Sequence, residues 1–119
     1  LFPLTEALEI LGFAAVMEGD IELTTLGKMF AKADALERKP IFARQLLTRI
    51  PLAQHIREVL DERGGYVSEE RFLSRLEDYL SEKEAERVLS TVIDWGRYAE
   101  IFAYDYNTGM LSLENPGAE

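Results

Sequence analysis

Alternation of apolar and polar residues, the pattern of a half-buried strand, is confined to two short stretches of this chain, and each surrounds a turn signal. The first stretch covers residues 13–23, with the turn at Gly19-Asp20, and Ala15, Met17, Ile21 and Leu23 alternate around it. The second covers residues 98–113, with a strand over 98–104, a turn at 107–109 and a return strand over 110–113. All other apolar stretches have the spacing of an amphipathic helix. We therefore expect a mainly α fold with two small β-hairpins.

The helical stretches carry recognisable start and stop signals. Apolar spacing predicts helices over residues 1–11, 26–33, 35–49, 52–63, 69–80 and 82–96. Asp34 with Glu37, and Ser81 with Glu84, have the spacing of capping boxes, whereas Thr24 or Thr25 and Ser68 are single N-cap candidates. Gly12, Gly64-Gly65 and Gly96 mark helix ends, and Pro51 suits a first helical position. Pro40 either kinks the first turn of its helix or shifts the start of that helix to a later residue.

The order of these elements predicts the architecture. Residues 51–114 have the order helix, helix, helix, hairpin, which is a winged-helix-like unit. Residues 1–33 have the order helix, hairpin, helix, which matches the trailing half of a second winged-helix-like unit. We expect residues 34–50 to form a connecting helix and residues 115–119 to form a tail. The chain starts at Leu1 inside a periodic apolar pattern, so we expect it to be part of a longer protein.

Composition excludes several classes of protein. The 119 residues include no cysteine, so disulfides, thiolate metal sites and cysteine nucleophiles are excluded. The single histidine, His55, leaves no room for a multi-histidine metal site and is expected to be a partly buried helix residue. We find no phosphate-binding loop, no nucleophile elbow and no zinc-protease helix motif. The chain is therefore expected to be neither an enzyme nor the holder of a cofactor or metal.

Charge argues against nucleic acid as a partner. The net charge is −9, and residues 64–119 hold 5 basic and 12 acidic side chains. A helix that reads DNA needs cations near phosphates and amide or guanidinium groups facing base edges. The helix in the reading position, 82–95, instead exposes mostly acids, and its outward residues include Glu84, Glu86, Arg87, Ser90, Thr91 and Asp94. A DNA-binding fragment of a transcription regulator is kept as the alternative function. Residues 28–63 carry a net charge of +3, which fits either a solvated face or a contact with an acidic partner.

Aromatic residues gather at the last helix and its hairpin. Alternation places Tyr98, Phe102 and Tyr104 on one strand face, with Trp95 and Arg97 just before them. Packing of the hairpin on the helix would account for this cluster. The sharper interpretation is a candidate interaction surface made of these five residues, because aromatic and arginine side chains are enriched at binding hot spots.

Six runs of sequence carry a resemblance to a known family. They are LFPLTEALEILGFA (1–14), GDIELTTLGKMFAKAD (19–34), LERKPIFARQLL (36–47), PLAQHIREVLDER (51–63), RFLSRLEDYLSEKEAERVLSTVIDWGRYAEIFAYD (71–105) and TGMLSLE (108–114). The most specific pieces are LAQHIREVLDER and the run from Asp94 to Phe102. On these residues the chain resembles the AAA-associated C-terminal domain family, which follows the ATP-binding subunit of ABC transporters of the nitrate/sulfonate/taurine type.

The resemblance implies a context and no catalytic or ligand-binding residue. It implies a regulatory or interaction domain in the cytoplasm, peripheral to the inner membrane as part of a transporter complex. ATP and magnesium would be bound by the upstream ATPase domain. The implied partners are that ATPase domain or its dimer mate, with the permease contacted indirectly, and a homodimer is a further candidate. No nucleic acid and no membrane insertion are expected.

Overall fold

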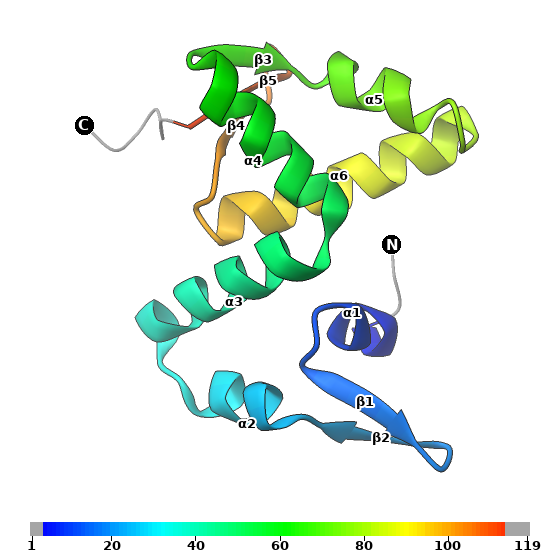
Figure 1. Cartoon of the computed structure of the whole chain (residues 1–119), viewed down its shortest axis with the longest axis vertical. Helices are drawn as coiled ribbons and strands as arrows, with labels where there is room; N and C mark the ends of the chain where they lie inside the picture. The colour runs from blue at the N-terminus through cyan, green and yellow to red at the C-terminus, as the bar shows by residue number, and fades with distance from the viewer. Residues whose placement is uncertain (1–3, 114–119) are drawn as a thin grey trace. The chain divides into compact units, whose positions relative to one another are not determined.

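The computed structural model describes residues 4–113, which form six helices and five short strands (Figure 1). The predicted mainly helical fold with small antiparallel hairpins is confirmed. The chain divides between Pro51 and Leu52 into two compact units, here called the N-terminal unit and the C-terminal unit. Residues 34–50, predicted to connect two units, form a helix of the N-terminal unit. The predicted tail, 115–119, and the first three residues of the first predicted helix lie outside the described residues.

The N-terminal unit opens with a helix that ends at a glycine, as predicted. Its elements are α1 (Leu4–Ile10), β1 (Ala14–Met17), β2 (Asp20–Leu23), α2 (Thr25–Lys32) and α3 (Ala35–Arg49). Gly12 follows α1 with a φ of +83°, and its N–H donates to the carbonyl of Glu9 at 3.0 Å. The N–H of Phe13 donates to the carbonyl of Leu8 at 2.8 Å. This pair of bonds is a Schellman motif, which satisfies carbonyls at the end of the helix and turns the chain into β1.

The first hairpin is present, but the predicted turn is wrong by one residue. The two turn residues are Glu18 and Gly19, which both have positive φ, at 53° and 85°. A two-residue turn of this kind has the twist that joins antiparallel strands. Asp20 is therefore the first residue of β2, and Val16 pairs with Ile21. Consequently Ile21 and Leu23 share a face with Val16, while Ala15 and Met17 lie on the opposite face.

Two predicted caps fix the helices after this hairpin. The hydroxyl of Thr24 accepts from the N–H of Gly27 at the start of α2. Asp34 and Glu37 form a complete capping box, so α3 begins at Ala35 and its start is not shifted by Pro40. Pro40 lies inside α3, where it removes the bond that its N–H would donate to the carbonyl of Leu36. Leu36 is 83% exposed.

Three phenylalanine rings centre the N-terminal unit. The Phe13 ring lies 4.7 Å from that of Phe30 and 6.2 Å from that of Phe42, measured between centroids. α2 approaches this cluster closely, because a Cβ at Gly27 would overlap the carbonyl group of Phe13. The buried amide of Gln45 donates to the carbonyl of Leu11 at 2.8 Å and so joins α3 to the end of α1. The hairpin side chains Val16, Ile21 and Leu23 remain exposed.

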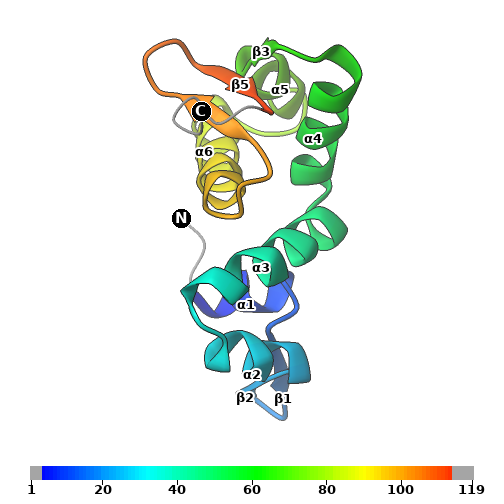
Figure 2. The same cartoon turned by 90° about the vertical axis from the view of Figure 1, so that its left-hand side faces the viewer.

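The C-terminal unit is winged-helix-like, with three helices and a small antiparallel sheet. Its elements are α4 (Pro51–Arg63), β3 (Tyr66–Ser68), α5 (Glu70–Leu76), α6 (Glu82–Tyr98), β4 (Ala103–Asp105) and β5 (Met110–Ser112). The predicted hairpin is therefore β4–β5, and β5 lies in the middle of the sheet, paired with β3 on its other edge (Figure 2). β3 was not predicted, because three residues are too few to show alternation.

The missed strand explains an error at Ser68. This residue was predicted to cap a helix, but it ends β3, and the N-cap position of α5 is taken by Glu69. The Ser68 hydroxyl nevertheless accepts from the N–H of Glu70 at 3.2 Å. At the next helix the prediction is confirmed, since Ser81 and Glu84 form a complete capping box.

α6 ends at Tyr98, two residues after the predicted end near Gly96. Gly96 acts there as a packing residue and not as a helix terminator, because a Cβ on it would overlap the ring of Phe102. The predicted strand over residues 98–104 is consequently wrong, and β4 covers only Ala103–Asp105. The buried side chains of the C-terminal unit come from all three helices, β3, β5 and the segment after α6. The largest of the fully buried ones are Ile56, Leu60, Phe72, Leu89 and Leu111. Among residues 4–113, no helix is long and apolar enough to cross a membrane.

Candidate functional site

The five residues predicted as an interaction surface do not form one face. Tyr98 belongs to the last turn of α6, so it cannot share a strand face with Tyr104 on β4. Phe102 is only 4% exposed and is part of the core. Trp95 and Tyr104 are half-buried, and Arg97 and Tyr98 are exposed. The alternation that grouped these residues fails because helical geometry continues two residues past Gly96.

Two of the five, Arg97 and Tyr104, do take part in a connected set of side chains. A guanidinium N–H of Arg97 donates to the hydroxyl of Tyr106, and its carbon lies 4.7 Å from the centre of that ring. The rings of Tyr106 and Tyr104 meet edge to face at 5.0 Å. The hydroxyl of Tyr104 donates to Oε2 of Glu69 at 2.8 Å. Together these contacts link the end of α6, the start of the hairpin loop and the start of α5.

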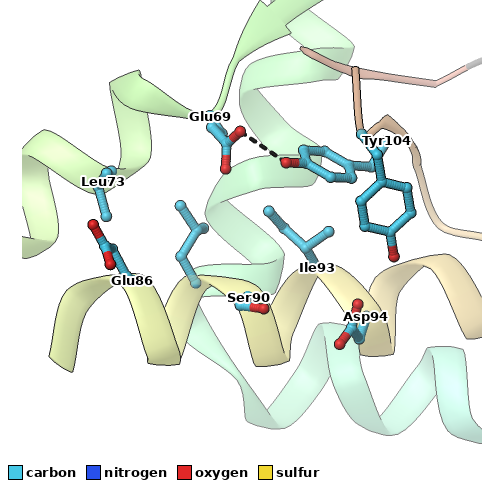
Figure 3. A pocket seen from close by; sticks show the side chains of 9 residues that line it. Glu69, Leu73, Glu86, Ser90, Ile93, Asp94 and Tyr104 are labelled. Carbon is cyan, nitrogen blue, oxygen red and sulfur yellow. Dashed lines mark hydrogen bonds between the residues drawn. The ribbon is translucent and has the colours of Figure 1, made fainter. Parts of the chain in front are cut away.

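This set borders a cavity of about 270 Å³ within the C-terminal unit, between α5, α6 and the β4 side of the hairpin (Figure 3). We call it the acidic groove. Three carboxylates line it: Glu69 at the start of α5, and Glu86 and Asp94 on α6. Tyr104 and Tyr106 form its wall on the hairpin side. No lysine or arginine is among its lining residues in the described part of the chain.

The carboxylates of the acidic groove differ in how they are satisfied. Glu69 accepts the bond from Tyr104. Glu86 and Asp94 are exposed and form no hydrogen bond or ion pair with any residue in 4–113. They lie eight residues apart on α6 with Ser90 between them, a spacing that places all three on one helix face. The α6 face of the groove therefore carries two uncompensated negative charges.

Tyr104 responds to this environment. Burial, followed by its hydrogen bond to Glu69 and the negative charge there, raises the pKa of Tyr104 to about 12. Ionising the hydroxyl would remove the donor of that bond and place a second anion beside the carboxylate. The group is therefore neutral, and a donor, throughout the physiological range.

The raised pKa predicts a pH effect specific to Tyr104. The unfolded chain loses this phenolic proton near its ordinary pKa of 10, before the folded chain does. The stabilising contribution is thus present below pH 10 and is lost as pH rises toward 12. Ultraviolet titration of tyrosinate should show an ionisation step near pH 12 in the folded protein, and Tyr104→Phe should remove this step. A step near pH 12 that persists in the variant would contradict this assignment.

Glu86, Ser90 and Asp94 were predicted as outward residues of the helix, but the groove that they line was not predicted. Their spacing of four residues was the available signal for a common face. Glu69 could not be placed, because its position depends on β3, which brings the start of α5 close to the hairpin. Its N–H bonds to the carbonyl of Gly109 at 2.9 Å.

His55 is half-buried on α4, as predicted. Its ring meets the Phe72 ring edge to face, with centroids 5.7 Å apart. Its Nε2 lies 3.2 Å from Nη1 of Arg75. These contacts are those of a packed helix residue. Within residues 4–113, no group of three or more histidine or acidic side chains is placed to hold a metal ion.

The fold and the groove together define the class of this chain: a winged-helix-like module whose third helix presents acids at a groove instead of cations. Residues 1–105 match the family described as the C-terminal AAA-associated domain, and the chain belongs to that family. The family supports an accessory domain, C-terminal in an ATPase-type protein, and is not a known catalytic one. No curated protein and no solved structure gives a significant match.

Proposed function

We propose that this chain is a regulatory protein-interaction domain at the C-terminus of an ABC transporter ATP-binding subunit, in an importer of the nitrate/sulfonate/taurine type. In this proposal the upstream ATPase domain binds ATP and magnesium and carries out hydrolysis. The chain contacts that domain or its dimer mate on the cytoplasmic side of the membrane and adjusts its activity. The permease is reached only through the ATPase domain.

The observation that carries this proposal is family membership over residues 1–105. The charge of α6 supports a protein partner over a nucleic acid. In a winged helix the third helix is the one that enters the DNA major groove. Here the corresponding helix exposes Glu86 and Asp94, and Arg87 is one of its few cations. Carboxylates at this position repel phosphates and attract cationic groups.

Deletion tests the proposed function. The full ATP-binding subunit, assembled with its permease, should be compared with the same subunit lacking the C-terminal segment that corresponds to this chain. Nucleotide affinity should be retained, because the nucleotide site lies in the upstream domain. ATP turnover, or its response to transported solute, should change about fivefold or more if the domain is coupled to the ATPase. Unchanged turnover and transport in all solute conditions would contradict a regulatory role.

The alternative, a DNA-binding regulator fragment, is tested by titrating the chain against random duplex DNA at low salt, monitored by fluorescence anisotropy. Binding to phosphates weakens steeply as salt increases. Saturable, salt-sensitive binding that is reduced by Arg87→Ala would favour the alternative. We expect no binding, because the exposed face of α6 is acidic.

A further inference from the structure

We infer that the acidic groove docks a segment of a partner protein that presents an arginine side chain next to an apolar residue. This inference rests on the proposed function, because it names the chemistry of the partner of the same domain. The groove lies wholly within the C-terminal unit and is formed by α5, α6 and the hairpin.

The acidic groove concentrates negative charge. Glu69, Glu86 and Asp94 contribute three carboxylates to one groove, and Glu86 and Asp94 have no ion pair or hydrogen bond within residues 4–113. Figure 3 shows the carboxylate of Glu86 beside Leu73 and that of Asp94 further along α6, with Glu69 across from them on the α5 side. A cation entering between α5 and α6 is therefore approached by acids from both helices.

Two tyrosine rings, those of Tyr104 and Tyr106, form the aromatic wall of the groove. Tyr106 already holds a guanidinium of the same chain: that of Arg97, which stacks on the ring and hydrogen-bonds its hydroxyl. The ring of Tyr104 meets that of Tyr106 edge to face, and its hydroxyl donates to Glu69, so Tyr104 extends this wall to Glu69. A planar, weakly hydrated guanidinium packs on aromatic rings better than a compact ammonium does. The wall thus favours arginine over lysine.

The floor of the groove is apolar. Leu89 and Ile93 of α6 are buried beneath the groove, and Leu73 of α5 is half-buried at its side. An arginine side chain has an aliphatic stem that covers apolar surface while its head group remains among polar groups. A volume of about 270 Å³ is at the lower limit for a small-molecule site, which suits one long side chain with a neighbouring apolar contact.

A pair of peptides tests the inference. The whole chain, ¹⁵N-labelled, is titrated with the blocked peptide Ac-Ser-Leu-Arg-Leu-Ser-NH₂, and with the same peptide carrying citrulline, the neutral isostere of arginine. The arginine peptide should shift the amide signals of Leu73, Ser90 and Tyr104. The citrulline peptide should bind about tenfold more weakly, a loss expected for charge-assisted hydrogen bonds.

Matched variants of the chain separate the groove from general charge. Glu86→Gln with Asp94→Asn should weaken the arginine peptide about fivefold or more, as two partly exposed pairs are lost. Glu58→Gln with Glu62→Gln removes the same charge from the exposed face of α4 and should change affinity less than about twofold. Both variants alter exposed residues without a partner in the described part of the chain, so folding should be retained.

Three results would overturn the inference: no shifts in the groove up to saturating peptide, equal binding of the arginine and citrulline peptides, or equal weakening by the two double variants. These outcomes are independent of the deletion test above. Groove binding with unchanged ATP turnover on deletion would retain the docking site and reject the regulatory role. Altered turnover without groove binding would retain the regulatory role and reject this site.

Discussion

Replacing Gly27 by alanine is expected to destabilise the N-terminal unit by about 2–3 kcal/mol, although alanine normally stabilises a helix interior by about 1 kcal/mol relative to glycine. The reversed sign follows from the contact between α2 and the chain before β1. A Cβ at Gly27 would overlap the carbonyl carbon and oxygen of Phe13, which are backbone atoms and cannot rotate away. The same carbonyl accepts a bond from the N–H of Thr24 at 3.0 Å, so moving it disrupts a second contact.

Urea unfolding followed by circular dichroism measures this effect, with amide exchange in α2 and α3 to locate it. Lys28→Ala is the matched control, because Lys28 is the exposed neighbour on the same helix and should change stability by less than about 0.5 kcal/mol. A Gly27→Ala protein as stable as the parent chain would show that α2 can separate from Phe13 without loss.

The second large effect is expected at Gly96 and Phe102, where the close contact is made by a side chain. Gly96→Ala should destabilise the C-terminal unit by about 1–3 kcal/mol, because the new methyl group overlaps the Phe102 ring. Phe102→Leu, which leaves a smaller side chain in this core position, should also be destabilising. In the double variant the overlap is relieved, so the two losses should not add, and alanine regains its helix preference.

Trp95, the only tryptophan in the sequence, lies next to Gly96. Its fluorescence therefore reports the unfolding of this region. A double-mutant cycle with additive losses would mean that the ring of Phe102 is not what excludes a side chain at position 96. The two glycines thus predict different behaviour: a second substitution can relieve the contact at Gly96 but not the one at Gly27.

Helix boundaries were predictable where side chains cap the backbone locally. Asp34 with Glu37 and Ser81 with Glu84 act within one turn, and Gly12 ends α1 through its own φ. The predicted boundaries were wrong where a contact with a residue further along the chain determines the role of a glycine. Gly96 looked like a helix end because nothing nearby in sequence shows that its missing side chain accommodates Phe102.

The candidate site was harder to predict for the same reason. Glu86 and Asp94 could be assigned to one outward face from spacing alone. Glu69 reaches the groove only because β3 pairs with β5, a contact between segments more than forty residues apart in the chain. The predicted aromatic surface failed at Phe102, which the end of α6 turns into the core. Local patterns therefore identified the helices, and tertiary pairing determined the groove.

The small β1–β2 sheet has a consequence for handling the protein. Both of its strands are edges, and Val16, Ile21 and Leu23 are exposed on it. Such an edge can pair with another copy and start aggregation. Glu18, Asp20 and Glu22 are interspersed among these apolar residues, and their charges act as gatekeepers that keep copies apart. The separation of copies therefore depends on three charged side chains that all lie on one hairpin.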